Sequence, residues 1–339
     1  MEYGAIDLHK RRSQIRIVTE TGAVVLERRI DTTRAALTEV FGGRAQLRVL
    51  VESSTESEWV AQALEALGHE VVVADPSFGA MYATRSKRVK TDGRDVAALA
   101  EACRTGMYRR AHRASAAARG LRRTLRVRTQ LVRQRASTIC LLRALLRQEG
   151  LRLGSGTASR VVDRLAQVAV PAALATGLAP LRDLLTHLTT TLDAIDEALH
   201  ARAAQDVVTQ QLMSAPGVGP VVALTFQAVL DTPTRFRDAG AVTAYLGLVP
   251  SEDSSGERRR KGSITKAGPR DLRALLVQAS WVIWRGKRDP GVGLRAWAHA
   301  LAGRRGRRIA VVALARRLAR VLFALWRDGT DFRVQPTGA

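Results

Sequence analysis

Cysteine, lysine and acidic residues are scarce in this chain of 339 residues. The two cysteines, Cys103 and Cys140, lie in arginine-rich sequence and form no CxxC pair, which excludes a disulfide framework and a cysteine zinc site. No uncharged apolar run reaches the roughly 18 residues of a membrane span, and the N-terminus lacks the pattern of a secretory signal. We therefore expect a reduced, cytoplasmic protein with no membrane partner.

Positive charge dominates the composition. The 54 Lys and Arg residues against 31 Asp and Glu give a formal net charge of +23 at pH 7, which indicates a polyanionic partner such as nucleic acid. Six of the 54 are lysine, so 54 − 6 = 48 are arginine, whose planar guanidinium binds phosphate through two hydrogen bonds. Hydrophobic residues form 46% of the chain, which is enough for buried cores and excludes disorder throughout.

The N-terminal part alternates short apolar runs with turn signals. This pattern predicts strands and helices in the order strand Tyr3–Leu8, strand Gln14–Val18, strand Ala23–Ile30, helix from Asp31, strand Leu47–Val51, helix Trp59–Leu67 and strand Glu70–Val73. Tight turns between the first three strands predict an antiparallel meander. A meander followed by strand, helix and strand is typical of an RNase H-like (RuvC-like) α/β domain.

The middle of the chain combines an arginine-rich segment with a heptad repeat. Residues 103–148 contain thirteen arginines and no Asp or Glu, and their apolar spacing predicts one long helix with an arginine face for nucleic acid. Candidate contacts there are Arg109, Arg110, Arg122, Arg123 and Arg126. Leucines and one isoleucine from Leu178 to Leu199 alternate spacings of three and four, which predicts a coiled-coil hairpin or a dimer contact, although a seam inside one bundle has the same pattern.

These patterns divide the chain into four regions. We expect an α/β domain at 1–105, an arginine-rich helix and coiled-coil region at 106–206, a mainly α-helical domain at 207–330, and a tail at 331–339.

Four carboxylates stand at positions that such a fold brings together. Asp7 and Glu52 end the first and fourth strands, which are neighbours in an RNase H-like sheet, and Asp92 and Asp95 share one face at the start of a helix. Taken singly, an acid at a strand end or a helix start is common in proteins without a metal, and Asp92 also suits a helix N-cap. Together they favour a site for Mg²⁺ or Mn²⁺ acting on a scissile phosphate.

Basic and histidine residues flank these acids in the sequence. Arg88 and Lys90, just before Asp92, would bring phosphate to the site. His9 follows Asp7 closely enough to touch it, although a solvent-facing turn residue is the more typical role.

The C-terminal domain carries two further motifs. Gly217 and Gly219, in a Pro-Gly-Val-Gly-Pro turn between helices, would free backbone N–H groups for a phosphate, or serve only as a turn. Ser254 and Ser255 precede a basic run at Arg258, Arg259, Arg260 and Lys261. A serine attacking phosphorus requires such neighbouring charge, while a flexible surface loop is the plainer interpretation. No histidine lies nearby, which argues against a Ser-His-Asp hydrolase.

Short motifs in fixed order span nearly the whole chain. They are Ile6-Asp7, Val51-Glu52, Asp75-Pro76, Lys90-Thr91-Asp92-Gly93-Arg94-Asp95, Pro216-Gly217-Val218-Gly219, Leu246-Gly247-Leu248-Val249-Pro250, Ser254-Ser255-Gly256, Ile264-Thr265-Lys266-Ala267-Gly268 and Leu272-Arg273. In these motifs the chain resembles the insertion-sequence one-ten family of transposases, which pair a RuvC-like DEDD domain with a serine-bearing transposase domain. One departure is that Glu52 is followed by Ser-Ser-Thr-Glu-Ser-Glu-Trp rather than the usual Thr-Gly-aromatic run.

The resemblance implies roles for particular residues and partners. Asp7, Glu52, Asp92 and Asp95 would bind the metal, and Ser255, with Ser254 as second choice, would become joined to DNA. A structured noncoding RNA encoded by the element, the bridge RNA, would direct recombination. The protein would form dimers that pair into tetramers, with acids of one subunit working beside the serine domain of another.

The sequence thus predicts a DNA transposase or site-specific recombinase. The alternatives are a metal-dependent RuvC-like nuclease of DNA junctions, in which the serine is incidental, and a non-catalytic nucleic-acid-binding protein.

Overall fold

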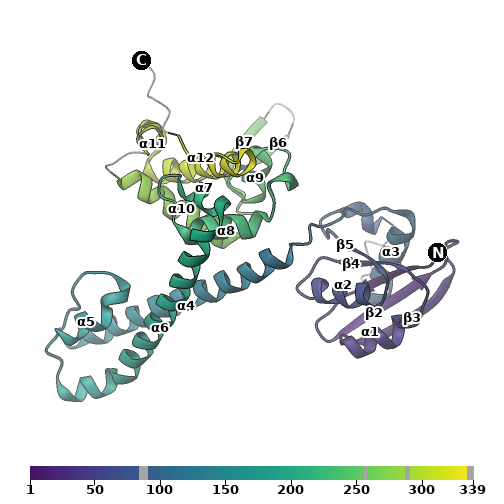
Figure 1. Ribbon diagram of the computed structural model, residues 1–339, viewed down its shortest axis with the longest axis horizontal. Helices are drawn as coiled ribbons and strands as arrows, with labels where there is room; N and C mark the ends of the chain where they lie inside the picture. The colour runs from purple at the N-terminus through teal and green to yellow at the C-terminus, as the bar shows by residue number, and fades with distance from the viewer. Residues whose placement is uncertain (84–90, 256–257, 287–290, 334–339) are drawn as a thin grey trace. The chain divides into compact units, whose positions relative to one another are not determined.

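The computed structural model describes residues 1–83, 91–255, 258–286 and 291–333. The chain folds as two compact units, Met1–Ala114 and Ser115–Ala339 (Figure 1). The middle region expected at 106–206 is therefore no separate body, because its helices pack with those of the C-terminal region. Among the described residues, no helix combines the length and apolarity needed to cross a membrane.

The first unit is built on a mixed five-stranded sheet. Its strands are β1 (Tyr3–Asp7), β2 (Arg12–Val18), β3 (Val24–Asp31), β4 (Arg48–Glu52) and β5 (Glu70–Ala74), in the spatial order β3-β2-β1-β4-β5. The first three strands are antiparallel, and β1, β4 and β5 are parallel. The predicted meander and the predicted neighbouring of the first and fourth strands are both confirmed, and the sheet fits an RNase H-like α/β domain.

Helices cover both faces of this sheet. Side chains of β1 and β4 alternate, so Ile6, Val49 and Val51 pack against α1 (Arg34–Phe41) and α2 (Ser57–Ala66). Ala5 and Leu50 face the other way and pack against α3 (Asp92–Thr105), beside a short 3₁₀ turn, η1 (Gly79–Tyr82). The α3 face is the one that carries the acids at the strand ends.

The single helix predicted from Cys103 onward is wrong, because α3 ends at Gly106, which has the left-handed conformation (φ 73°). The following residues return along β5: the Asp75 N–H donates to the Arg109 carbonyl (2.8 Å) and the Ala111 N–H to the Val73 carbonyl (2.8 Å). This pairing extends the first unit to Ala114, beyond the boundary expected at 105.

The second unit is almost entirely helical. Its elements are α4 (Ala116–Gln148), η2 (Ala158–Arg160), α5 (Val161–Ala166), α6 (Ala172–Gln205), α7 (Val207–Met213), α8 (Pro220–Leu230), η3 (Pro233–Arg235), α9 (Ala239–Tyr245), β6 (Pro250–Ser255), β7 (Arg258–Ile264), α10 (Arg270–Arg285), α11 (Val292–Arg305) and α12 (Arg307–Asp328). The two long helices α4 and α6 pack against each other, and α12 lies in the bundle core among α7, α9, α10 and α11 (Figure 1).

The heptad seam of α6 is covered within the chain itself. Leu178 and Leu185 are buried with Ile139, Leu142 and Leu146 of α4, and Leu199 is buried with residues of α4 and α8. The leucines of the heptad therefore pack inside one helical bundle of the same chain, which is one of the alternatives that the sequence pattern allowed.

Candidate metal centre and nucleic-acid interface

Strand register places Asp7 and Glu52 side by side. Ile6 pairs with Val51 in the parallel β1–β4 ladder, so the next residues, Asp7 and Glu52, are neighbours at the carboxyl ends of the two strands. Each lies two residues beyond a side chain that packs on α3, and alternation therefore directs both carboxylates to the α3 face. Asp7 is buried and Glu52 is half-buried.

The start of α3 supplies the other two acids. The Thr91 hydroxyl accepts a hydrogen bond from the Arg94 N–H, so Thr91 is the N-cap and Asp92 the first helical residue, which corrects the expectation that Asp92 itself caps the helix. Asp95 is buried, in the layer that contains Val96 and Leu99, whereas Asp92 is only partly buried. Acids in a first helical turn are stabilised by the positive end of the helix dipole.

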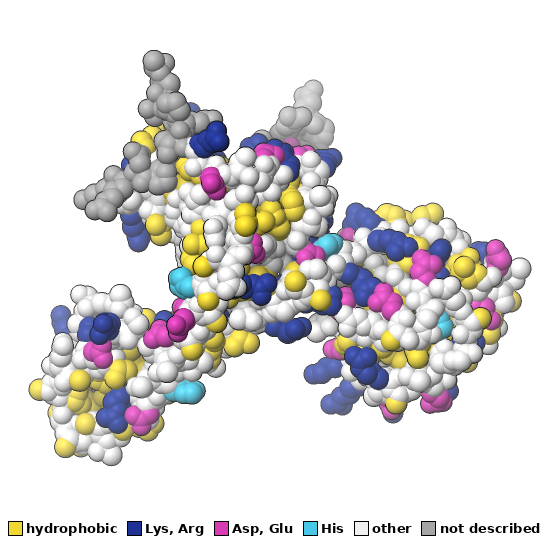
Figure 2. All heavy atoms as spheres, viewed as in Figure 1, with side chains coloured by type: hydrophobic (Ala, Val, Ile, Leu, Met, Phe, Trp, Pro, Cys, Tyr) yellow, Lys and Arg dark blue, Asp and Glu magenta, His cyan; other side chains and the backbone are white. Residues whose placement is uncertain are grey.

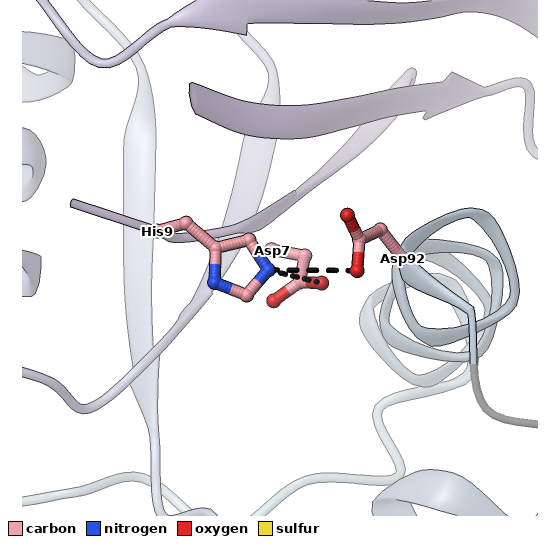
Figure 3. A group of neighbouring side chains, drawn as sticks. All are labelled: Asp7, His9 and Asp92. Carbon is pink, nitrogen blue, oxygen red and sulfur yellow. Dashed lines mark ion pairs between the residues drawn. The ribbon is translucent and has the colours of Figure 1, made fainter. Parts of the chain in front are cut away.

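Three side chains converge at this point: Asp7, His9 and Asp92. One ligand atom from each lies within 4.8 Å of the other two. The His9 Nε2 is 3.5 Å from Asp7 Oδ2 and 3.7 Å from Asp92 Oδ1. Figure 3 shows the imidazole pointing at both carboxylates from the second residue after β1, while Asp92 reaches in from α3.

Glu52 and Asp95 lie beyond this inner group. Asp95 lies on the same helix as Asp92, and Glu52 lies beside Asp7 on the neighbouring strand. Among the described residues, neither belongs to the group whose ligand atoms lie within 4.8 Å of one another. The structure thus brings Asp7 and Asp92 together as expected and adds His9. The participation of Glu52 and Asp95 stays a prediction.

The convergent donor set suits a divalent cation. Two carboxylates and an imidazole are ordinary ligands of such ions, and Asp7 and Asp92 come from rigid elements, a strand end and a helix start. Arg29 of β3 adds positive charge beside the site, with its Nη2 3.8 Å from Asp92 Oδ2. The sequence analysis did not identify Arg29. It could have been found only from the strand register, in which Asp7 pairs with Gln14 of β2 and Gln14 pairs with Arg29 of β3.

Two of the predicted phosphate-binding arginines have acidic partners inside the first unit. Arg109 donates to Asp75 (2.6 Å) and to the Ser77 hydroxyl (2.8 Å), and Arg110 lies 3.4 Å from Glu70. Hydrogen bonds from Ser77 and then from Arg109 lower the pKa of Asp75. The absence of acids near these arginines in the sequence was misleading, because β5 and the turn after it supply them.

A groove in the second unit collects the arginines of α4. It has a volume of about 820 Å³ and is lined by residues of α4, α8 and the start of α10, among them Arg122, Arg123, Arg126, Arg133 and Arg270. Arg122 donates to the carbonyls of Ala228 (2.7 Å) and Val229 (2.9 Å) at the end of α8, and Arg133 pairs with Asp271 (2.6 Å).

The remaining groove arginines are available to a ligand. Arg123, Arg126 and Arg270 are exposed and form no ion pair with any residue in the described part of the chain. Arg270 is the first residue of α10, whose N-cap residue, Pro269, makes no side-chain hydrogen bond to the helix, and both residues line the groove. In the view of Figure 2, basic side chains (dark blue) lie on the surfaces of both units.

The Pro-Gly-Val-Gly-Pro turn has a packing role. Gly217 adopts φ +72°, and a Cβ on it would lie 2.6 Å from the Ala279 carbonyl of α10. Gly219 is the N-cap of α8 and is followed by Pro220 at the first helical position, which removes one of the N–H donors that a phosphate would use. Phosphate binding by Gly217 and Gly219 stays a prediction.

The serine motif lies on the β6–β7 hairpin. In its antiparallel register Ser254 pairs with Arg259, and Ser255 with Arg258. Side-chain placement for Ser254, Ser255 and the basic run Arg258, Arg259, Arg260 and Lys261 lies outside the described residues, as do Arg88 and Lys90 entirely.

Close backbone packing fixes the base of this hairpin. A Cβ on Gly247 would lie 2.2 Å from the Ala267 carbonyl, and one on Gly268 would lie 2.0 Å from the Tyr245 carbonyl. Arg273 donates to the carbonyls of Leu246 (2.9 Å) and Ala267 (3.0 Å). Lys266 is exposed here and holds a positive φ of 55°. The Leu-Gly-Leu-Val-Pro and Thr-Lys-Ala-Gly motifs therefore tie the two ends of the hairpin together.

Comparison with known proteins finds one family at both ends of the chain. Residues 209–291 match a profile described as "Transposase IS116/IS110/IS902 family", and residues 5–150 match the DEDD transposase profile of IS110 elements.

Curated relatives match over almost the full length. A "Probable family 20 transposase" of Pseudomonas aeruginosa is 29% identical, covering 97% of both chains. The transposase for insertion sequence element IS1328 of Yersinia enterocolitica is 28% identical over 96% of this chain and 97% of its own. The transposase for insertion sequence element IS1111A of Coxiella burnetii is 29% identical over 97% of this chain and 90% of its own. The chain belongs to the IS110/IS116 family of transposases.

Proposed function

We propose that this transposase cuts and rejoins DNA by combining a metal centre in the first unit with a serine in the second. The observation that carries the proposal is the convergence of Asp7, His9 and Asp92 at the end of the central strand, within 4.8 Å. A divalent cation there, Mg²⁺ or Mn²⁺, would polarise the scissile phosphate and stabilise charge on the departing oxygen. Glu52 and Asp95, adjacent in the ladder and on the helix, would complete the acid set.

Ser255 is the proposed nucleophile, with Ser254 as second choice. Its hydroxyl would give up its proton and form a bond to phosphorus while a deoxyribose oxygen departs with a proton, leaving DNA joined to the protein. Because the phosphoester bond is conserved, a deoxyribose hydroxyl of another strand could reverse the step without ATP. Arginines of β7 pair with the serines along the hairpin backbone, and positive charge of that kind suits the developing phosphorane.

Nucleic-acid partners would be held by the basic surfaces. The groove with Arg123, Arg126 and Arg270 is suited to a phosphate backbone. We propose both DNA and a noncoding bridge RNA as partners, the RNA supplying target choice. Since the acids and serines lie in different units of the chain, a dimer pairing into a tetramer would allow acids from one subunit to meet the serine of another.

Transposition of a marked element between plasmids tests the metal centre. Asp7→Asn and Asp92→Asn should abolish it, while Asp193→Asn on an exposed stretch of α6 should leave it intact. Circular dichroism of each variant separates loss of chemistry from loss of fold. Unchanged transposition in the folded Asp7 and Asp92 variants would refute the metal centre.

The alternative function is a metal-dependent nuclease, favoured by the fact that Asp7, His9 and Asp92 converge within the first unit without any serine of the hairpin. Ser255→Ala distinguishes the two: metal-dependent strand cutting survives in a nuclease and disappears in a serine recombinase.

A further inference from the structure

We infer that His9 is a direct ligand of the metal and makes the site a mixed nitrogen and oxygen centre that prefers Mn²⁺ to Mg²⁺. The inference rests on the proposed metal centre and goes beyond it by naming a ligand and a metal preference.

The imidazole is placed to share an ion with both carboxylates. Its Nε2 lies 3.5 Å from Asp7 Oδ2 and 3.7 Å from Asp92 Oδ1, and both separations exceed the roughly 2.7–3.2 Å of an N–H···O hydrogen bond. In an octahedral ion with bonds of about 2.1 Å, adjacent ligand atoms lie roughly 3.0 Å apart and opposite ones roughly 4.2 Å. The observed separations fall between these values, so small side-chain movements would bring all three atoms onto one ion.

The turn that presents His9 is held in place by its neighbours. The His9 N–H donates to the Ser13 hydroxyl (3.4 Å), and the Thr32 hydroxyl donates to the His9 carbonyl (2.8 Å). Ser13 and Thr32 also share a hydroxyl contact of 2.8 Å, and Ser13 is only 1% exposed. These bonds fix the backbone of the turn, so the imidazole extends from a defined position toward Asp7 and Asp92.

The two oxygens of Asp92 are directed differently. Oδ1 faces His9 and Oδ2 lies 3.8 Å from Arg29 Nη2. Arg29 thereby favours an orientation that leaves one oxygen directed toward the side where Asp7 and His9 meet. A cation at that place would receive one oxygen from each aspartate and one nitrogen from His9.

The ligand chemistry sets the preference. Mg²⁺ strongly favours oxygen ligands and retains its waters, whereas first-row transition ions accept imidazole nitrogen readily. Replacing one oxygen of an all-acid site by Nε2 therefore weakens Mg²⁺ binding relative to Mn²⁺, and Mn²⁺ reports on its own ligands by electron paramagnetic resonance.

The test uses the full-length protein with Mn²⁺ or Mg²⁺ as the only added ligand. Binding of Mn²⁺ is measured by paramagnetic resonance and that of Mg²⁺ by calorimetry, and nitrogen coordination is detected as ¹⁴N hyperfine coupling to bound Mn²⁺. His9→Ala should remove the coupling and weaken Mn²⁺ binding by at least about tenfold, the lower end of what losing an outer partner costs. Mg²⁺ affinity should change much less, and His9→Asp should favour Mg²⁺. His187→Ala on α6 is the matched control.

The outcomes separate this inference from the proposed function. If Asp7→Asn and Asp92→Asn do not weaken binding of either ion, the metal centre itself is refuted. If they do, but His9→Ala leaves the ¹⁴N coupling in place or raises the affinity for both ions, His9 is not a ligand of the metal and the inference is overturned.

Discussion

The backbone of Gly217 touches the neighbouring helix so closely that a Cβ there would lie 2.6 Å from the carbonyl oxygen of Ala279. Gly217 also holds φ +72°, a conformation that disfavours other residues. Two residues on, Gly219 has φ −102° and nothing within 4 Å of a Cβ position. Within one motif, Gly217 is therefore required for close packing against α10, whereas Gly219 is not.

Alanine at each glycine should show which of the two is required for packing. Gly217→Ala should destabilise the protein by about 1–3 kcal/mol, the usual cost of an enforced strained backbone, whereas Gly219→Ala should be close to neutral. Thermal unfolding followed by circular dichroism measures both. Equal melting temperatures for the two variants would contradict the packing role of Gly217.

The two cysteines should differ sharply in reactivity. Cys103 is fully buried under the sheet, and burial raises the pKa of its thiol to about 12, whereas Cys140 is exposed. At pH 8 a thiol reagent should modify Cys140 at once and Cys103 only after unfolding. The Cys140→Ser variant should therefore show no fast-reacting thiol, and fast labelling in it would contradict the burial of Cys103.

The same pKa shift has a consequence for stability. The folded state holds the Cys103 proton more tightly than an unfolded thiol, whose pKa is about 8.5. The contribution of the Cys103 thiol to the free energy of unfolding is thus complete below about pH 8.5 and declines as the pH rises toward about 12. A Cys103→Ala variant should lose less stability than the wild type between pH 8 and pH 10 in urea unfolding.

The groove of the second unit should account for a measurable part of nucleic-acid binding. Replacing Arg123, Arg126 and Arg270 together by Gln removes three cations without ion-pair partners among the described residues. The slope of log K against log salt should fall by about 0.7–0.9 for each phosphate that the protein no longer neutralises. Filter binding or fluorescence anisotropy with DNA and RNA oligonucleotides measures the slope.

A triple variant of equal charge controls for overall electrostatics. Arg160, Arg182 and Arg202 are exposed residues outside the groove, and their change to Gln lowers the net charge by the same amount. If both triple variants lose affinity equally, binding reflects net charge alone and the groove has no special role.

Sequence periodicity predicted the first unit well because its strands and turns are local features. The meander and the order of strands and helices follow from runs of a few residues, and the meeting of Asp7 with Asp92 follows from the fold that this order indicates. His9 was weighed as a turn residue, because nothing in the sequence shows that Ser13 and Thr32 anchor that turn.

Predictions that depended on distant partners were less successful. Arg109 and Arg128 stand in a stretch without acids, yet they pair with Asp75 and Asp196, which lie far away in the chain. The helix expected from Cys103 was wrong because Gly106 ends α3 and the next residues hydrogen-bond to β5. The heptad of α6 could not distinguish a partner chain from α4, which covers it.

The proposed covalent step between serine and DNA can be measured directly. The protein is expressed with DNA carrying the ends of its element, nucleic acid is digested, and peptides spanning Gly247–Arg258 are searched by mass spectrometry for a nucleotide-modified serine. We expect a nucleotide on Ser255, absent from Ser255→Ala and from Asp7→Asn. Metal-dependent cutting without any adduct in this peptide would contradict serine recombination and favour a nuclease.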